Sequence, residues 1–244
     1  MIKNNFRTLV IGDIHGSLES LTGVLKIASY DPKYDRLICL GDYIDGWTQS
    51  FEVVDALIQY QIESPHENIY LLGNHDQYFI YVLNDGIEQM RNEDLTMTIN
   101  AEWWEQGGEA TYRGYIVHSD DDIRRHKEMF YDRLKYCHME ANQLFVHGGF
   151  NPRLGLESTM RIDKGELLMN RLLYEQALHH SDPNTKFGDF DKIFIGHTPT
   201  ISSGHLFPRP VCNVINLDQG CKLDKRLTSW VLETGEWYQY EKGL

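Results

Sequence analysis

The sequence lacks any excess of positive charge, and this absence limits the partners it can have. Its 244 residues include 23 Lys and Arg against 36 Asp and Glu, which gives a formal net charge of -13. A basic face for nucleic acid is therefore not expected. An acidic protein also repels an anionic substrate, so local cations such as bound metals would be needed to attract one.

Long apolar runs and paired cysteines are also missing. No run approaches the ~18 residues of a membrane helix, and residues 1–7 contain no signal-peptide stretch. The four cysteines are Cys39, Cys137, Cys212 and Cys221, and none belongs to a C-x-x-C pair. Cys39 lies inside an apolar run, where burial is typical of a free cysteine. We therefore expect a cytoplasmic protein without membrane association.

The first half of the chain alternates between strand and helix patterns. Apolar runs at 8–11, 36–40 and 68–72 predict strands, and helices are expected after Ser17, as an N-cap, and from Phe51. This order predicts parallel strands with right-handed crossovers. In such sheets, ligands bind beyond the carboxyl ends of the strands.

The second half predicts a further set of elements. Residues 84–140 are expected to form a helical cap region, and the C-terminal part is expected to be antiparallel β. With no repeat or linker, we predict a single domain, 1–244, with an α/β fold of two packed mixed β-sheets flanked by helices. The individual predictions are strands at 142–146, 192–195, 211–217, 225–232 and 237–240, and a helix at 164–178.

Six short segments carry Asp, His or Asn, most of them where an apolar run stops. Oxygen and nitrogen ligands delivered by loop ends suit divalent cations. Five such segments in sequence are difficult to explain by structure alone. The six are 12–16 (GDIHG), 41–46 (GDYIDG), 73–76 (GNHD), 146–149 (VHGG), 196–198 (GHT) and 216–220 (NLDQG).

These residues predict a site for two divalent metals, Mn first, with Fe or Zn as alternatives. Asp42 is the expected bridging ligand, because it follows the middle of three predicted strands. A metal-bridging hydroxide would attack phosphorus. The other expected ligands are Asp13 and His15 on the first metal, and Asn74, His147 and His197 on the second.

His75 is the expected general acid for the leaving group. It follows Asn74 directly, so its side chain should point elsewhere, toward solvent or substrate. A protonated histidine beside a carboxylate is a good proton donor, and Asp45 is the expected carboxylate that orients it.

At these motifs the chain resembles the calcineurin-like metallophosphoesterases. It is most similar to the phosphoprotein-phosphatase branch, which includes small bacterial and bacteriophage Ser/Thr phosphatases and symmetrical diadenosine tetraphosphatases. The resemblance runs from about Leu9 to Tyr240 and includes 104–111 (WEQGGEAT), similar to the W-x-x-G-G-x-x-T element. It implies the same metal ligands and the same acid pair, and it implies that Arg171, which ends a further matching segment, holds the substrate phosphate.

The chain departs from that branch at two places. Gly46-Trp47 stands where the branch usually has Arg-Gly, so one phosphate-binding Arg is missing unless Arg113, Arg161 or another residue replaces it. Asp76 stands where protein phosphatases commonly have Glu. The Asp form is common among the dinucleotide hydrolases, whereas the retained Asp45 favours a phosphatase.

Simpler explanations exist for several of these residues. Asp13, Asp42 and Asp45 could cap helices, and Arg171 could be a surface residue of an amphipathic helix. We expect Trp103 and its neighbour Trp104 to pack in the core or cap rather than to stack on a base.

The sequence therefore predicts a metal-dependent phosphoester hydrolase, first of all a phosphoprotein Ser/Thr phosphatase. The alternative is a dinucleoside polyphosphate hydrolase such as a diadenosine tetraphosphatase. A further alternative is a non-catalytic scaffold of the same fold, against which the intact candidate ligands argue. Either enzyme would have a phosphorylated protein or nucleotide as its partner.

Overall fold

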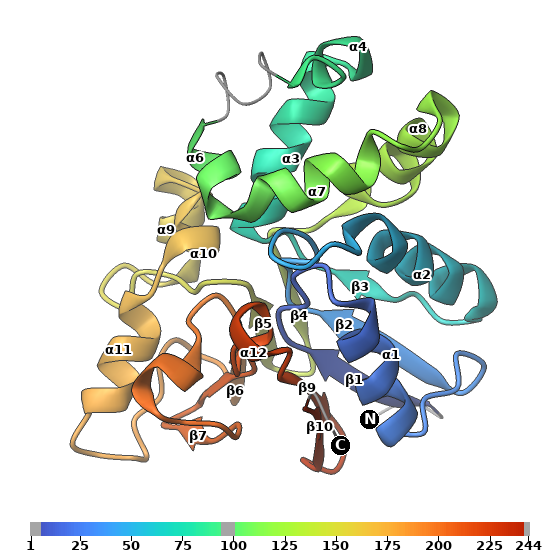
Figure 1. The fold of residues 1–244 in the computed structure, drawn as a ribbon. Coiled ribbons are helices and arrows are strands. Elements are labelled where there is room, and N and C mark those ends of the chain that lie inside the picture. The colour runs from blue at the N-terminus through green and yellow to red at the C-terminus, as the bar shows by residue number, and fades with distance from the viewer. Residues whose placement is uncertain (1–5, 94–100, 242–244) are drawn as a thin grey trace.

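The computed structural model describes residues 6–93 and 101–241, and five-stranded β-sheets form its centre (Figure 1). In the first sheet β1, β2 and β3 are parallel, β9 runs antiparallel to β1, and β10 runs antiparallel to β9. The strand order is β10 (Trp237–Tyr240), β9 (Leu227–Val231), β1 (Arg7–Ile11), β2 (Asp35–Cys39) and β3 (Ile69–Tyr70).

The second sheet has a parallel centre and antiparallel edges. Strands β5, β6 and β8 are parallel, and β4 and β7 pair antiparallel at the two sides. Its order is β4 (Cys137–Glu140), β5 (Gln143–Val146), β6 (Lys192–Ile195), β8 (Val214–Asn216) and β7 (Pro210–Val211). The prediction of two packed mixed sheets flanked by helices is confirmed.

The expectation of an antiparallel C-terminal half is wrong in two respects, because β8 runs parallel to β6 and because the last two strands do not belong to the second sheet. The antiparallel pair β9 and β10 joins the first sheet, where β9 covers the free edge of β1 with Leu9 opposite Val231. An open edge beside a buried strand would leave backbone groups unpaired. The chain therefore returns at its end to complete the sheet with which it began.

Alternation along the strands separates the core into layers. In β1, Val10 packs between the two sheets with Phe145 and Phe194, whereas Leu9 and Ile11 face the helices on the other side. A separate cluster joins the second sheet to its own helices. Because each sheet is covered on both faces, its strands read as continuous apolar runs.

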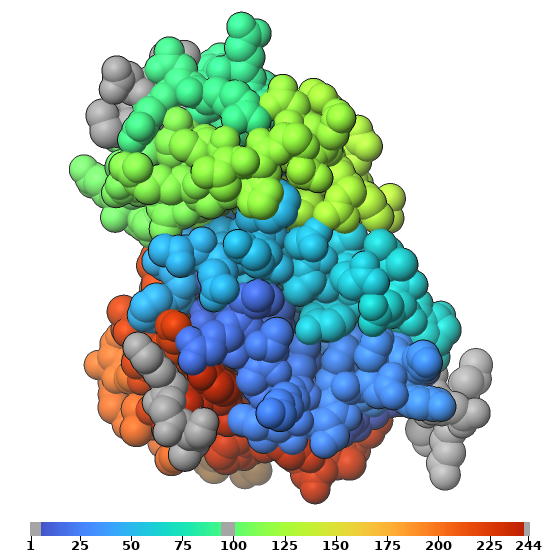
Figure 2. All heavy atoms as spheres, turned by 45° about the vertical axis from the view of Figure 1, so that its right-hand side comes forward, coloured from blue at the N-terminus to red at the C-terminus, as the bar shows by residue number. Residues whose placement is uncertain are grey.

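Helices cover the outer faces of both sheets (Figure 1). Those from α3 to α8 gather above the strands, and Figure 2 shows them as a green lobe over the blue N-terminal segment. The single-domain organisation stays a prediction. Residues 94–100 of the expected cap lie outside the described residues. Residues 1–5, in which no signal peptide is expected, also lie outside them. The elements are α1 (Leu18–Ile27), α2 (Ser50–Glu63), α3 (Asn74–Asp85), α4 (Ile87–Met90), α6 (Ala101–Trp103), η1 (Trp104–Gly108), α7 (Glu109–Tyr115), α8 (Asp120–Met129), η2 (Tyr131–Arg133), α9 (Leu156–Ile162), α10 (Glu166–Met169), α11 (Leu172–His179), η3 (Thr200–Ser203) and α12 (Cys221–Asp224).

The predicted helix at 164–178 is broken into α10 and α11. Asn170 has an extended backbone, and its side-chain oxygen accepts a hydrogen bond from the Leu173 N–H at 3.1 Å. Asn competes with the helix backbone in this way and so starts the next helix. The break also places Arg171 at the edge of the candidate site.

The predicted strand at 211–217 is a short hairpin instead. Cys212 has φ 53°, which turns the chain between β7 and β8. The side-chain oxygen of Asn213 accepts a hydrogen bond from the Phe187 N–H at 2.9 Å, and its side-chain nitrogen donates to the Phe190 carbonyl, also at 2.9 Å. An Asn that satisfies distant backbone groups favours a turn over a continuous strand.

All four cysteines are free, and Cys39 is buried as expected. Cys212 lies beside the carbonyls of Ala177 and Asp182, whereas Cys221 points to the carbonyl of Ile14. In the described part of the chain, none of the helices combines the length and the apolar character needed to cross a membrane.

His126 in the cap makes a testable contribution to stability at acid pH. Its ring is buried on Phe51, and burial lowers its pKa to about 4, with Asp55 opposing the shift. The folded state thus holds His126 neutral while the unfolded chain protonates it below about pH 6.5, so stability is lost as pH falls from about 6.5 to 4. We expect wild type to lose roughly 3 kcal/mol more than His126→Gln over this range, from 1.36 kcal/mol per pKa unit.

Urea unfolding with chelator present, at pH 7 and pH 4.5, measures this difference. The buried carboxylates titrate in both proteins, so their effects cancel in the comparison. Equal losses of unfolding free energy in the two proteins would contradict the prediction.

Candidate metal centre

The expected ligands lie just beyond the carboxyl ends of the parallel strands. Asp13 follows β1, Asp42 follows β2 and Asn74 begins α3 after β3, whereas His147 and His197 follow β5 and β6 of the other sheet. The carboxyl ends of both parallel sets therefore meet at one edge of the sandwich. This is where ligands bind in open α/β sheets.

One cluster consists of Asp42, His147 and His197, whose candidate ligand atoms all lie within 4.8 Å of one another. His147 Nε2 lies 3.4 Å from Asp42 Oδ2 and 3.2 Å from Asn74 Oδ1. The other ring nitrogen, Nδ1, donates to the Leu40 carbonyl at 2.9 Å. The proton on Nδ1 leaves Nε2 to serve as a ligand.

A second cluster consists of His15, Asp42 and His75. His15 Nε2 lies 3.6 Å from Asp42 Oδ2, and its Nδ1 donates to the Asp45 carbonyl at 2.8 Å. Asp42 belongs to both clusters, which is the arrangement that a bridging ligand requires. The sequence prediction did not place His75 in a metal cluster.

Asp13 belongs to neither three-residue cluster among the described residues, although it lies beside the second sheet. Its Oδ2 accepts the His197 N–H at 2.9 Å. Within the described part of the chain, its Oδ1 and the Nε2 of His197 are buried without a hydrogen-bond partner. Buried polar atoms are normally satisfied, so these two fit a site that receives a cation.

The charges of the centre also fit a cation. Burial and the nearby Asp218 raise the pKa of Asp13 well above its usual range. Burial lowers the pKa of His15 and of His197 to about 3, and both rings are therefore neutral and able to ligate. Burial opposes ionisation of Asp42 as well, but its histidine neighbours lower its pKa well below the usual range.

His147 differs from the other two histidines. Burial lowers its pKa, but Asp42 and Asp13 outweigh that effect and raise the pKa to about 10. A metal at Nε2 would take the place of this proton, because histidine ligates in its neutral form. The donor set is therefore chemically suited to two divalent metals.

Several site residues have strained backbones. His15, Asp42, Asp45 and His197 have φ values of 51°, 52°, 66° and 63°. Residues other than glycine rarely adopt this left-handed region, and the strain is usually found at functional sites. The surrounding loops therefore hold these side chains at a cost to stability.

Asp76, at which the chain departs from the protein phosphatases, holds together the loops that carry Asp42 and Asn74. Its carboxylate accepts the N–H groups of Asp42 at 2.8 Å, Tyr43 at 3.1 Å and Gly73 at 3.0 Å. Burial raises its pKa to about 7. Gly73 is needed because a Cβ there would lie 2.1 Å from Asp42 Oδ1.

His75 and Asp45 form the expected pair. His75 Nδ1 donates to Asp45 Oδ2 at 2.8 Å, and both residues are buried. Trp103 Nε1 donates to the same carboxylate at 2.7 Å, and Thr111 Oγ1 donates at 2.6 Å. Burial lowers the pKa of His75, but Asp42 and Asp45 outweigh it and the net shift is upward.

Sequence reasoning assigned no role in this pair to Trp103 and Thr111. Trp103 is buried in the core, as expected, and it also orients Asp45. Thr111 ends the 104–111 motif, which was its only sequence signal, and Trp103 directly precedes that motif. Both come from the cap helices, far from Asp45 in sequence.

Two cationic side chains border the centre. Arg171, which the sequence singled out, donates from Nη1 to the His197 carbonyl at 2.8 Å. Lys222, which no motif indicated, places Nζ 3.3 Å from His75 Nε2. Arg113, a suggested replacement for the missing Arg, is instead exposed and paired with Glu109 and Glu93.

A pocket of about 340 Å³ adjoins the centre at Asn74. Its walls include Tyr78 and Tyr81 from α3 and Tyr136 before β4. Lys164 lies over the Tyr136 ring, with Nζ 5.6 Å from its centroid. Flat aromatic groups could stack on such a wall.

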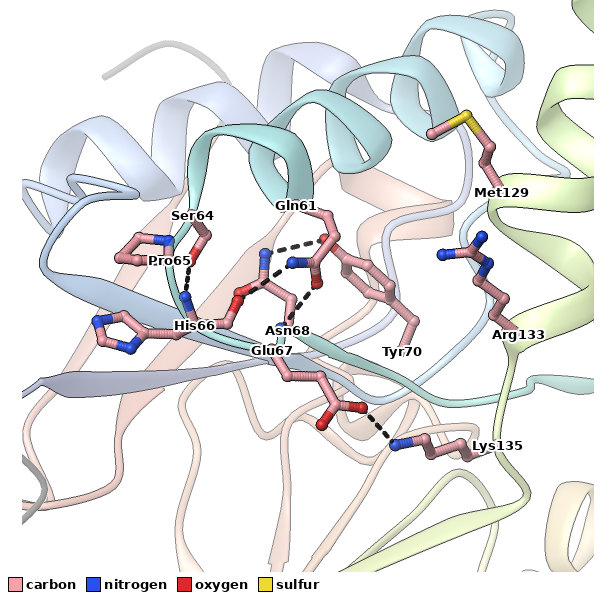
Figure 3. A pocket seen from close by; sticks show the side chains of 10 residues that line it. All are labelled: Gln61, Ser64, Pro65, His66, Glu67, Asn68, Tyr70, Met129, Arg133 and Lys135. Atoms are coloured by element: carbon pink, nitrogen blue, oxygen red, sulfur yellow. Dashed lines mark hydrogen bonds and ion pairs between the residues drawn. The ribbon is translucent and has the colours of Figure 1, made fainter.

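Another pocket, of about 560 Å³, lies between the end of α2 and residues 129–135 (Figure 3). Its polar groups bond to one another: Asn68 donates to Gln61 at 2.8 Å and to Tyr70 at 3.3 Å, and Lys135 pairs with Glu67 at 2.9 Å. Because these groups are mutually satisfied, we assign no ligand to this pocket.

The chain is similar to known phosphoesterases. The family model for calcineurin-like phosphoesterases matches residues 6–223. A symmetrical bis(5′-nucleosyl)-tetraphosphatase of Stutzerimonas stutzeri is 29% identical over 154 residues, which are 63% of this chain and 48% of that relative. The matched region is thus about half the length of that relative. An asymmetrical bis(5′-nucleosyl)-tetraphosphatase of Oceanobacillus iheyensis is 26% identical over 91% of this chain and 86% of its own length.

Solved structures show the same fold. A candidate diadenosine tetraphosphatase superimposes with a TM-score of 0.65 at 17% identity, covering 99% of this chain and 96% of its own. A protein serine/threonine phosphatase from Saccharomyces cerevisiae superimposes with a TM-score of 0.60 at 16% identity, covering 99% and 82%.

Proposed function

The chain belongs to the calcineurin-like phosphoesterase family, and from this membership we propose that it is a metal-dependent phosphoester hydrolase. Bound metals would lower the pKa of a water molecule and polarise the phosphoryl group. Mn is the proposed metal, with Fe or Zn as alternatives. The proposed ligands are Asp13, His15 and Asp42 for one ion and Asp42, Asn74, His147 and His197 for the other.

His75 is the proposed general acid. Asp45 accepts the hydrogen bond from Nδ1, so Nε2 is the ring nitrogen that would deliver a proton to the leaving group, on the side that Lys222 borders. Asp45 has its own donors in Trp103 and Thr111, which fix its position. An acid held in one orientation is effective because the proton donor must lie within hydrogen-bond reach of the leaving oxygen.

This pair carries the more specific proposal, a phosphoprotein Ser/Thr phosphatase. A Ser or Thr alkoxide is a much stronger base than a nucleoside diphosphate, so it leaves only with a proton. A buried and firmly held acid supports hydrolysis of an alkyl phosphate. Arg171 is proposed to bind the phosphate with the N–H groups that the His197 carbonyl does not use.

A dinucleoside polyphosphate hydrolase is the second candidate. It is supported by the names of the two relatives and by the tyrosine-lined pocket at Asn74, which has a wall on which a base could stack. Such an enzyme would release a nucleoside phosphate, a leaving group that does not require His75.

Product analysis of a phosphoserine peptide and of diadenosine tetraphosphate, each with Mn²⁺ or with chelator, tests the proposal. Free phosphate from the peptide, lost on chelation, supports the phosphatase. Nucleoside phosphates with little peptide turnover would favour the second candidate. Metal-loaded protein that hydrolyses neither substrate would contradict both and favour a scaffold.

The tyrosine pocket makes a separate prediction for the dinucleotide. Base–aromatic stacking contributes ~1–3 kcal/mol, so we expect Tyr81→Ala to lower kcat/KM for diadenosine tetraphosphate about 5- to 150-fold. Tyr81→Phe should retain most of the rate, and hydrolysis of a phosphopeptide should not change. Tyr34→Ala, at an exposed tyrosine before β2, serves as the control. Equal kcat/KM in Tyr81→Ala and wild type would rule out stacking at this wall.

A further inference from the structure

Lys222 on α12 carries a charge that its neighbours do not neutralise directly. Its ammonium donates to the Gln106 carbonyl at 2.8 Å and lies 3.3 Å from His75 Nε2. Among the described residues, no carboxylate lies within ion-pair distance of it. The side chain is half-buried, so water neutralises this charge only in part.

Two residues determine the position of Lys222: Gly46 leaves room for its side chain, and Trp47 anchors its helix. Gly46 has φ 121°, and a Cβ there would lie 3.2 Å from Lys222 Cγ. Trp47 Nε1 donates to the Cys221 carbonyl at 2.8 Å and so fixes the start of α12. These are the two positions at which this chain differs from the Arg-Gly of the phosphatase branch. A long side chain at Gly46 would crowd the Lys222 stem.

Because the Lys222 ammonium lies beside His75, it can contact a substrate group that His75 contacts. The Nε2 atom of His75 is the one from which the proposed proton transfer starts. A leaving oxygen within hydrogen-bond reach of Nε2 would also lie near the Lys222 ammonium. When substrate binds, the ammonium would contact the substrate in place of Nε2. Lysine is a compact charge that binds phosphate from one side.

We propose that Lys222 binds the substrate phosphate beside His75 and supplies the cation that is absent at Gly46. This inference rests on the proposed function, because it assumes that a phosphoryl group occupies the metal centre. Arg171 borders the opposite metal cluster through the His197 carbonyl. The two cations would hold the phosphate from two sides.

The test compares Lys222→Met with Lys222→Arg and with Lys186→Met, which removes the same charge from an exposed ion pair with Asp191. A hydrogen bond from a charged group contributes ~1.5–3 kcal/mol, which is about 10- to 150-fold in affinity. We expect Lys222→Met to raise by this factor the Kd of inorganic phosphate for the Mn-loaded protein, measured by titration calorimetry.

In Lys222→Met, the KM for 4-nitrophenyl phosphate should rise together with the Kd of phosphate. The kcat should fall less, and the metal content should stay that of wild type. Lys222→Arg should recover most of the affinity, and Lys186→Met should match wild type. Trp47→Phe, which keeps the charge but removes the anchor of α12, should weaken phosphate binding less than Lys222→Met and provides a second variant if the first does not fold.

Unchanged phosphate affinity in Lys222→Met would overturn the inference, and so would a loss of metal that accounts for the weaker binding. Failure of the proposed function looks different. If wild type binds phosphate in a Lys222-dependent way but hydrolyses no phosphoester, the binding role of Lys222 stands and the enzymatic proposal falls.

Discussion

Asp42→Asn should reduce phosphoesterase activity more than any other conservative change in this protein. Its Oδ2 lies 3.6 Å from His15 Nε2 and 3.4 Å from His147 Nε2, so one carboxylate faces both metal positions. The amide is neutral and cannot bridge two cations as a carboxylate does. Metal charge contributes several kcal/mol to the transition state, and at 1.36 kcal/mol per factor of ten the expected loss in kcat is ~10³-fold or more.

The same substitution should leave the fold intact, because most contacts of Asp42 that support the loop are made by its backbone, and the amide oxygen of Asn can still accept the His75 N–H that Asp42 Oδ1 accepts at 3.1 Å. Its N–H bonds to Asp76 at 2.8 Å, and its carbonyl accepts from Ile14 and His15. We expect the metal content per chain, measured by mass spectrometry, to fall. The rise in melting temperature that Mn²⁺ gives to wild type should shrink accordingly.

Asp191→Asn is the matched control, since it removes one carboxylate from an exposed ion pair with Lys186. It should retain the metal, the activity and the Mn-dependent stabilisation. An Asp42→Asn protein with full metal content and activity would show that the two clusters around Asp42 do not form the catalytic centre.

The sequence could predict where the proposed metal ligands would meet, because that information is local. Asp13, Asp42 and Asn74 each follow an apolar run, and parallel strands deliver their carboxyl ends to one edge. The same reasoning found His147 and His197, since β5 and β6 repeat the pattern in the second sheet. The right-handed crossovers of parallel strands left few alternatives for the arrangement.

What the sequence could not predict depends on contacts between distant segments. Trp103 bonds to Asp45 across 58 positions, and Lys222 reaches His75 across 147. Neither has a spacing or a flanking pattern that points to the other. The break at Asn170 was missed for a related reason. The apolar periodicity continues through it, whereas the break lies at the extended backbone of Asn170, whose side chain bonds to the Leu173 N–H.

His75→Asn should show a loss that depends on the leaving group. General acid catalysis contributes ~10²–10⁴-fold, so we expect kcat/KM for a phosphoserine peptide to fall by that factor. Hydrolysis of 4-nitrophenyl phosphate should fall much less, because nitrophenolate is stable without a proton. Asp45→Asn should give the same pattern with a smaller loss, since Asp45 acts by orienting His75. His179→Asn, at an exposed histidine on α11, should leave both rates unchanged.

The comparison of the two substrates also separates two possible roles of His75. The structure places it with His15 and Asp42 in one cluster of potential ligands, as well as beside Asp45. A metal ligand supports the attack on either substrate, so its removal would lower both rates by one factor and reduce the metal content. An acid acts on the leaving oxygen alone, so its removal changes the ratio of the two rates and leaves the metal in place. Equal losses with depleted metal would therefore move His75 from the proposed acid to the ligand set, and Asp45 would then orient a ligand rather than a proton donor.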